Sequence, residues 1–541
     1  MTNHLYYGDN LQVLRTEIAE ESVDLIYLDP PFNSNANYSM LFRSPDGKHS
    51  HAQSEAFEDT WHWGYEAENA YLEVLKCDNS DVSEMLVAMR SFLRENDMMA
   101  YLTMMTIRLI ELKRVLKDTG SIYLHCDPVA SHYLKIIMDA IFGKENFRNE
   151  ITWKRQSAHS DAKKKFPSVS DIILFYAKSK DSFFNPTYTE HNPEYIRKFY
   201  RFDDDDGKGL YRLDNMSSPT TYKGGMYEWK GYGYPKKGWR YKPETMEKLD
   251  AEGKIYYPLN ADGSFDIKKR LAVKRYLEEM EGSIITNVWT DINPLHSSNK
   301  EYMGYPTQKP IALLERIITA TSNEGDVVLD PFCGCGTTIH ASEKLRRNWI
   351  GIDVTSLAIA RIESRLAYAF PDVEFEIHGT PKDMDGAKSL ADADKYQFQW
   401  WAISLVNAVP YGGKKKGADG GIDGIIYFRP EGYNGATEKA IVSVKGGNNV
   451  SVTMIRDLAH VVEREKAKIG IFITIAEPTD PMVKEVVKEG YFETENGKYP
   501  KIQILTIGQL LNGTKPQIPL IDSGSFKKAG RDTRSTQGKL I

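Results

Sequence analysis

Cysteine is scarce in this chain, with four residues among 541. Cys77, Cys126, Cys333 and Cys335 are too few and too scattered for a disulfide framework, which favours a reducing compartment. No apolar stretch is long enough to span a membrane. The first residues lack a basic region followed by an apolar run, so no signal peptide is expected. Together these absences predict a cytoplasmic protein with no membrane contact.

Positive charge is not in excess either. The formal net charge is -6, so any site for a polyanion must be a local patch rather than a global basic field. No P-loop pattern occurs, which argues against an ATP-driven motor. Hydrophobic residues make up 41% and charged residues 27%, as in ordinary soluble proteins. A chain of this length exceeds one hydrophobic core, so we expect two to four domains.

The most informative stretch is Asp29-Pro30-Pro31-Phe32, which follows the apolar run 23–28. The run predicts a buried strand, and two consecutive prolines fix the backbone just beyond it. Asp29 and the Pro30 carbonyl can then accept the two hydrogens of an exocyclic amine while Phe32 stacks on a flat base. Two such acceptors favour an amine whose lone pair attacks an electrophile. A plain strand followed by a Pro-Pro turn is the competing interpretation.

A second motif lies about three hundred residues later. The short apolar strand 326–329 leads into 330–338, Asp-Pro-Phe-Cys-Gly-Cys-Gly-Thr-Thr, and then into a helix. A strand, glycine-rich turn and helix direct backbone N–H groups at a ligand, and Gly334 and Gly336 permit close approach. The next strand, 349–352, ends at Asp353, which is placed to accept from ribose hydroxyls. The region therefore predicts a site for a nucleoside-containing cofactor.

Near the start of the chain, Gly8-Asp9-Asn10 follows a short apolar segment and precedes a helical pattern. With the Asp29 strand this makes a βαβ unit, which places Asp9 and Asn10 at the carboxyl end of their strand, where open α/β sheets bind ligands. An N-cap role for Asp9 is the alternative.

These motifs, in this order, resemble the DNA amino-methyltransferases that use S-adenosyl-L-methionine, and in particular their permuted beta-type subgroup. The resemblance covers residues 1–385. It implies that Asp29, Pro30, Pro31 and Phe32 hold a base flipped out of double-stranded DNA. It also implies a set of cofactor-binding residues: Asp9, Asn10, Thr307, Lys309, Asp330, Pro331, Phe332, Gly334, Gly336, Thr337 and Asp353.

The chemistry narrows the target base. Methylation at cytosine carbon-5 needs a thiolate nucleophile, and no cysteine follows a proline in a comparable turn, so that reaction is rejected. Adenine N6 and cytosine N4 remain open. Within the resembled family the Asp-Pro-Pro-Phe form accompanies adenine more often, which favours adenine N6.

From about 185 to 295 the composition shifts to tyrosine, tryptophan, glycine and lysine. Interleaved aromatics and bases suit a groove reader that contacts phosphates and packs on bases or sugars. A small β-rich insertion with aromatic packing is the alternative. The residues singled out are Tyr211, Tyr222, Lys223, Trp229, Lys230, Tyr232, Tyr234, Lys236, Lys237, Trp239, Arg240 and Tyr241.

The last third carries a separate pattern. A glycine-rich basic loop, 412–424, precedes a predicted hairpin of strands 425–428 and 440–445. The segment resembles the Mrr-like PD-(D/E)xK restriction endonucleases. The resemblance makes Asp423 a ligand of Mg²⁺ and Lys445 a charge stabiliser. Ser443 stands where those nucleases usually have an acidic or amide residue, and a hydroxyl is a poorer magnesium ligand. A degenerate fold that only contacts DNA is the alternative.

We therefore expect an α/β protein with a doubly wound Rossmann-like methyltransferase sheet, a target-recognition insert and a smaller α/β restriction-endonuclease-like domain. The predicted ranges are 1–184 and 296–385 for the methyltransferase, 185–295 for the insert, 392–515 for the endonuclease-like domain and 516–541 for a disordered tail. Double-stranded DNA is the expected partner, in a prokaryotic cytoplasm and at the nucleoid. Whether the chain forms a homodimer is left open.

Overall fold

The computed structural model describes residues 2–31, 37–43, 49–58, 61–156, 164, 166–296, 298–303, 305, 307–411, 420–431, 436–495, 497–519, 532 and 534. The chain divides into two compact units. The larger combines Met1–Asn185 with Thr286–Gln537, and the smaller consists mainly of Pro186–Ile285. No helix among the described residues has both the length and the apolar character needed to cross a bilayer.

A nine-stranded sheet forms the centre of the larger unit, in the order β13-β6-β7-β5-β2-β14-β15-β1-β16. The pairings on either side of β7 are antiparallel, and the others are parallel. The strands are β13 (Val288–Trp289), β6 (Phe147–Lys154), β7 (Ser170–Ala177), β5 (Leu116–Cys126), β2 (Val23–Leu28), β14 (Val327–Asp330), β15 (Asn348–Asp353), β1 (Asn3–Tyr7) and β16 (Phe375–His378). The predicted doubly wound α/β sheet is confirmed.

Helices cover both faces of this sheet, which explains why its central strands are mainly apolar. One face packs against α1 (Asn10–Thr16), α4 (Asp97–Val115) and α5 (Ser131–Phe142), with α2 (Tyr65–Val74) and α3 (Ser80–Leu93) outside them. The other face packs against α9 (Thr337–Lys344) and α10 (Ser356–Ala369), and α8 (Ile311–Thr321) lies beside α9. A hairpin of β3 (Asn37–Arg43) and β4 (His49–Glu58) follows β2.

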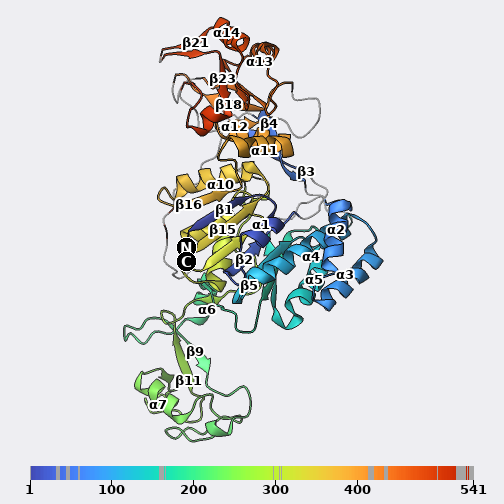
Figure 1. Cartoon of the computed structure of the whole chain (residues 1–541). Helices are drawn as coiled ribbons and strands as arrows, with labels where there is room; N and C mark the ends of the chain where they lie inside the picture. Colours follow the sequence, from blue (N-terminus) through green and yellow to red (C-terminus); the bar gives the residue numbers. More distant parts are fainter. Residues whose placement is uncertain are drawn as a thin grey trace. The chain divides into compact units, whose positions relative to one another are not determined.

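The topology brings together strand ends that are far apart in sequence. Leu25 and Ile26 of β2 pair in parallel with Val328 and Leu329 of β14. On the other side of β14, β15 pairs with β1, so the blue β1 lies among yellow strands in Figure 1. Because parallel strands end at the same edge, the carboxyl ends of β2, β14, β15 and β1 form one row.

Strand β5 follows helix α4 without a loop. Helix α4 ends at Val115, and β5 begins at once with Leu116 and continues to Cys126. Gly120 lies inside this strand, where a Cβ would stand 2.9 Å from the Asp24 carbonyl oxygen. Glycine at this position therefore permits close packing between β5 and β2.

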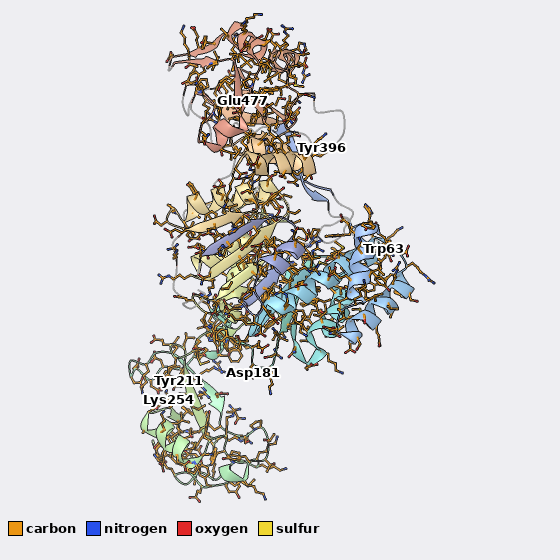
Figure 2. The ribbon with its side chains drawn as sticks, viewed as in Figure 1. Trp63, Asp181, Tyr211, Lys254, Tyr396 and Glu477 are labelled. Carbon is orange, nitrogen blue, oxygen red and sulfur yellow. The ribbon has the colours of Figure 1, made fainter. Side chains whose placement is uncertain are left out.

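The smaller unit has its own core. Its elements are β8 (Tyr188–Thr189), α6 (Pro193–Phe199), β9 (Tyr211–Asn215), α7 (Pro243–Ala251), β10 (Ile255–Tyr256), β11 (Ala272–Tyr276) and β12 (Ser283–Ile284), with β10-β11-β9 as a three-stranded sheet. Met216, Tyr232, Trp239, Met246 and Val273 belong to one buried cluster. Figure 2 marks this unit with the side chains of Tyr211 and Lys254.

The C-terminal part of the chain forms a five-stranded sheet, β17-β18-β19-β20-β23. Its strands are β17 (Val409–Pro410), β18 (Gly424–Phe428), β19 (Glu438–Lys445), β20 (Ile469–Thr474) and β23 (Ile502–Thr506), with a hairpin of β21 (Tyr491–Thr494) and β22 (Gly497–Pro500). The helices are α11 (Met384–Ala393), α12 (Lys395–Ser404), α13 (Val452–Arg464), α14 (Asp480–Lys488) and α15 (Ile507–Leu511). This is the predicted smaller α/β domain.

Candidate active site

A cavity of about 460 Å³ opens at the carboxyl ends of β2, β14, β15 and β1. Nearly all of the predicted site residues of the first 385 line it: Asp9, Asn10, Asp29, Pro30, Pro31, Thr307, Lys309, Asp330, Pro331, Phe332, Gly334, Thr337 and Asp353. Gly336 is near but does not line the cavity, and Phe32 lies outside the described residues. The structure thus brings the two separated motifs into one site.

Asp29 follows the buried strand β2 and is ion-paired with Lys309 through its Oδ2 atom. The Lys309 side chain is 9% exposed and that of Asp29 is 17% exposed, so the pair is largely shielded from water. The resemblance assigned Lys309 to cofactor binding, and its observed partner is the carboxylate proposed for catalysis. Lys309 Nζ stands as a hydrogen-bond donor to the same carboxylate that is expected to accept from a substrate amine.

The glycine-rich turn after β14 uses backbone conformations that favour glycine. Gly334 has φ +49° and Gly336 has φ +75°. A Cβ on Gly334 would lie 3.3 Å from the ring of Tyr305, and one on Gly336 would lie 2.7 Å from Ile362. The Gly334 N–H donates to Asp353 Oδ2 at 2.9 Å, which ties this turn to the end of β15.

Two buried carboxyl groups lie beside this turn. Burial raises the pKa of Asp330 to about 7, although bonds from Thr338 and the Phe332 N–H act in the opposite direction. Burial also raises the pKa of Asp353 to about 6, against hydrogen bonds from Thr355 and Gly334. An acidic residue with a pKa near neutrality in a cavity is typical of a functional site.

Asp9 and Asn10 are both held by Arg108, a residue that no sequence motif singled out. Arg108 on α4 donates to Asn10 Oδ1 at 2.6 Å and to Asp9 Oδ2 at 2.8 Å. Asn10 in turn donates to the Pro331 carbonyl oxygen at 2.8 Å. Asp9 Oδ1 also accepts from the Gln12 N–H, so the predicted N-cap and the cavity position are both observed.

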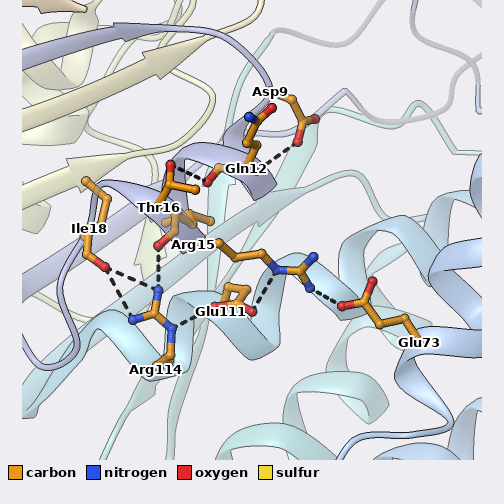
Figure 3. Close-up of polar contacts among 9 residues, drawn as sticks. Asp9, Gln12, Arg15, Thr16, Ile18, Glu73, Glu111 and Arg114 are labelled. Atoms are coloured by element: carbon orange, nitrogen blue, oxygen red, sulfur yellow. Dashed lines mark hydrogen bonds and ion pairs between the residues drawn. The ribbon is translucent and has the colours of Figure 1, made fainter.

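Figure 3 shows how α1 is fixed at its other end. Arg15 on α1 reaches Glu73 on α2 and Glu111 on α4. Arg114 donates to the carbonyl oxygens of Leu14 and Ile18, which lie at and just beyond the end of α1. These contacts join the second half of α1 to α2 and α4.

A series of buried polar contacts begins in β2, the strand that precedes Asp29. Tyr27 Oη lies 2.9 Å from His125 Nδ1, and His125 Nε2 lies 3.2 Å from Asp171 Oδ2. Burial raises the pKa of Tyr27 well above its usual value, with the nearby Asp29 carboxylate adding to the effect. Tyr27 also lines the cavity, so this series of contacts reaches it.

The aromatic residues of the insert divide into two groups. Tyr211, Tyr232 and Trp239, which the composition suggested for base contact, are at most 3% exposed and belong to the interior of the insert. Tyr234 is 50% exposed, and Lys236 and Lys237 beside it are also exposed. Of these positions, the exposed ones are thus two lysines beside one ring, with far fewer exposed rings than the sequence indicated.

The predicted nuclease residues lie outside the cavity, on two neighbouring strands. Asp423 directly precedes β18, Lys445 ends β19, and Gly424 pairs with Val442. Asp423 Oδ1 accepts from Gln399 Nε2 at 2.6 Å, and its Oδ2 accepts from the Val444 N–H at 2.6 Å. Part of the preceding loop, 412–419, lies outside the described residues.

Magnesium prefers carboxylate oxygens and water. Asp423 supplies a carboxylate whose two oxygens both accept N–H bonds, and Ser443 supplies a hydroxyl. Among the described residues, a cluster of three metal-ligating side chains occurs at His4, Glu376 and His378, on a different sheet. A Mg²⁺ site at Asp423 therefore stays a prediction.

Three residues beyond 385 also line the large cavity: Asp394, Gln397 and Trp400, on or next to α12. Arg108 and Trp61 are further lining residues that no motif indicated. Tyr305, which also lines the cavity, begins the segment 305–310 that contains the predicted Thr307 and Lys309.

Comparison with known proteins supports both resemblances. The family model described as DNA methylase matches residues 23–363. A second model, described as restriction endonuclease, matches residues 390–495. The two matches follow each other along the chain in the predicted order, a methyltransferase and then an Mrr-like domain.

Individual relatives agree. The Type II methyltransferase M.EcaI of Enterobacter cloacae is 31% identical over 370 residues, which cover 68% of this chain and 70% of that protein. The Type III StyLTI Mod subunit of Salmonella typhimurium is 28% identical over 347 residues, covering 62% of this chain and 48% of that protein. The solved PvuII DNA methyltransferase, described as cytosine-N4-specific, aligns at 12% identity and TM-score 0.33, covering 67% of this chain and 85% of that one.

Proposed function

Because the chain belongs to the DNA methylase family, matched over residues 23–363, we propose that it transfers a methyl group from S-adenosyl-L-methionine to adenine N6 in double-stranded DNA. The observation that supports this most is the meeting of the Asp29 turn with the Gly334 turn in one cavity. The groups that accept the hydrogens of the amine and the site for the nucleoside cofactor then lie in the same cavity, as direct methyl transfer requires.

The residues fit the methyl donor. A volume of about 460 Å³ lies within the range of ligand pockets, roughly 300–1,000 Å³. Gly334 has φ +49°, and a Cβ there would lie 3.3 Å from the Tyr305 ring, so glycine suits a turn whose backbone closely approaches a ligand. Asp353, at the end of β15, is placed to accept from ribose hydroxyls. When bound, the donor supplies an electrophilic methyl group on a sulfonium.

The protein's own groups then act on the base. In this proposal the Asp29 carboxylate and the Pro30 carbonyl accept the two amine hydrogens, so the nitrogen lone pair is directed at the methyl group. Lys309, the ion-pair partner of Asp29, holds this carboxylate in position. The base must leave the duplex to reach this depth, because its amine is paired inside the double helix.

Substitution of Asp29 tests the reaction. Asp29→Ala is expected to abolish transfer of tritiated methyl groups to DNA while S-adenosylhomocysteine still binds, because the cofactor contacts lie on other strands. Asp118→Ala, at a carboxylate that is 73% exposed, is the control and should keep full activity. Retained transfer by Asp29→Ala would remove Asp29 from its role.

Cytosine N4 is the alternative target, since the matched family includes both reactions. The Asp-Pro-Pro-Phe form of the motif supports adenine. Long-read sequencing of DNA from cells that express the protein identifies the base and the site together. Modified cytosine in place of modified adenine would mean that the same site methylates cytosine N4.

DNA cleavage is a second candidate function. It is favoured by the restriction endonuclease match over 390–495 and by the position of Asp423 and Lys445 on neighbouring strands. Plasmid cleavage in the presence of Mg²⁺ should disappear in both Asp423→Ala and Lys445→Ala. Cutting that persists in both variants would exclude these residues, and DNA binding without cutting by the wild type would support a DNA-contacting domain instead.

We further propose the division into a methyltransferase of 1–184 and 296–385, a recognition insert of 185–295 and an endonuclease-like domain of 392–515. The exposed Lys236 and Lys237 are proposed phosphate contacts of the insert. A homodimer and a location at the nucleoid stay predictions. Of the predicted tail 516–541, most residues lie outside the described part of the chain.

A further inference from the structure

One face of α12 belongs to the large cavity. Asp394, which caps this helix, and Gln397 and Trp400 on it all line the cavity. A spacing of three residues places side chains on the same side of a helix, so the three form a continuous strip. All three lie beyond the DNA methylase match and inside the restriction endonuclease match. The wall of the proposed cofactor pocket is thus built by both segments.

The position of this strip is fixed by contacts on both sides. Tyr7 Oη, at the end of β1, donates to Gln397 Oε1 at 3.3 Å. Asp394 Oδ1 accepts from the backbone N–H groups of Tyr396 and Gln397, which fixes the carboxylate at the helix start. Burial, with the nearby carboxylates of Asp394 and Asp353, raises the pKa of Tyr7 to about 12, so its hydroxyl stays a donor at neutral pH. Helix α12 also packs against α10, a helix of the methyltransferase sheet (Figure 1).

The strand order shows which end of the ligand this strip meets. Asp29 follows β2, and the glycine turn and Asp353 follow β14 and β15, the next strands in the sheet. Tyr7 ends β1, one strand further from Asp29. A ligand with its reactive methyl at Asp29 and its ribose at Asp353 must therefore extend its base toward β1, and so toward Gln397 and Trp400.

We propose that α12 closes the nucleobase end of the cofactor pocket, with Gln397 and Trp400 as binding residues for the purine ring. The inference rests on the proposed methyltransferase function. Trp400 offers an aromatic face for stacking on the purine. Gln397, whose Oε1 already accepts from Tyr7, keeps an amide N–H for a purine ring nitrogen. Affinity for a nucleoside ligand then depends on a helix of the endonuclease-like segment.

The experiment measures binding of S-adenosylhomocysteine to the full chain by calorimetry. Gln397→Ala removes a half-buried amide and is expected to weaken binding about fivefold, the usual effect of one hydrogen bond. Trp400→Ala is expected to weaken it about tenfold or more, as loss of a base-stacking ring does. Trp400 also belongs to the core of the endonuclease-like segment, so Trp400→Phe, which keeps an aromatic face, should bind within about threefold of wild type.

Tyr396→Ala is the matched control. Tyr396 is a half-buried aromatic residue on the same helix, labelled in Figure 2, and it does not line the cavity. Its loss should leave affinity unchanged. The same variants are then tested with 5′-methylthioadenosine, which carries the base but lacks the amino acid portion. The fold-loss for Gln397→Ala should be equal for both ligands.

The outcomes separate this inference from the function on which it rests. Wild-type affinity in both Gln397→Ala and Trp400→Ala, with folding verified by thermal denaturation, would overturn the assignment of α12 but leave the methyltransferase proposal intact. Equal losses in Tyr396→Ala would also overturn it, since they would indicate a general disturbance of the helix. Failure of the wild type to bind S-adenosylhomocysteine at all would contradict the proposed function itself.

Discussion

The ion pair between Lys309 and Asp29 makes the two halves of the site depend on each other at the level of single residues. Lys309→Met removes the positive charge that faces the largely buried carboxylate of Asp29. The carboxylate then loses both its orientation and its counter-charge. We expect the single-turnover rate of methyl transfer to fall at least about tenfold, the order of a lost electrostatic contact in a shielded site. DNA binding should not change.

Lys309→Arg serves as the comparison, because it keeps the charge at a shifted position. It should retain more activity than Lys309→Met. A full rate in Lys309→Met would show that Asp29 is held in place by other groups.

Asp330 gives a prediction about pH. Its pKa, raised to about 7 by burial, means that the folded protein keeps this proton to a higher pH than the unfolded chain does. The contribution to stability is therefore greatest at low pH and is lost as pH rises toward 7. Asp330→Asn removes this loss, so its gain in Tm over wild type should be larger at pH 8 than at pH 5.

The size of that effect follows from the shift. One pKa unit corresponds to about 1.4 kcal/mol, so the difference between the two pH values should be on the order of 2 kcal/mol. Thermal unfolding of both proteins at pH 5 and pH 8 measures it. An identical difference at both pH values would show that Asp330 is ionised in the folded state throughout.

At the scale of elements, α4 positions the start of α1 through one buried side chain. Arg108 holds Asp9 and Asn10, and Asn10 contacts the Pro331 carbonyl of the glycine-rich turn. Arg108→Gln should weaken S-adenosylhomocysteine binding by about tenfold or more, since breaking a buried charged contact costs several kcal/mol, about 3–5. Isothermal calorimetry measures the loss.

Arg15→Ala is the control for this prediction. Arg15 also joins α1 to α4, but its side chain is 36% exposed and one of its partners, Glu73, is 51% exposed. Surface ion pairs contribute about 0–1 kcal/mol, so affinity should stay close to wild type. A large loss in Arg15→Ala would mean that the whole helix contact, rather than Arg108, sets the affinity.

The main elements could be predicted from sequence because their signals are local. Buried parallel strands are mainly apolar, as 327–329 is and as 23–28 is apart from Asp24, and both runs are followed by an acidic residue and a proline. The pairing of β2 with β14 followed only from the resemblance, since three hundred residues separate them. Residues of the cavity were found wherever they belong to these strand ends.

Other features depend on partners distant in the chain. Arg108 is one basic residue in an amphipathic helix, and nothing near it shows that it is buried against Asp9. Tyr211, Tyr232 and Trp239 were expected to read DNA, yet composition does not tell which side of a short strand faces the interior. Gln397 and Trp400 line the cavity, and no pattern in the sequence around them indicates it.

At the scale of the whole molecule, the unit Pro186–Ile285 has an interior of its own. Trp239 is 3% exposed in that interior, so Trp239→Ala should destabilise this unit by about 3–5 kcal/mol, the usual effect of truncating a buried tryptophan. DNA binding, measured by gel shift, should fall. Affinity for S-adenosylhomocysteine should stay unchanged, because the cavity residues lie in the other unit.

Trp229→Ala, at a partly buried position of the same unit, gives a milder comparison. A loss of cofactor affinity in Trp239→Ala would show that the two units do not fold independently.

Helix α12 faces two ways: Gln397 and Trp400 line the cavity, and Gln399, between them in sequence, donates to Asp423. If the cavity holds the methyl donor and Asp423 serves cleavage, a nonsense mutation shortly after residue 385 removes protection of the genome together with the means of attacking it. A cell that loses this stretch of the gene then loses methylation and cleavage together. It is not left with a nuclease that attacks unmethylated sites of its own genome.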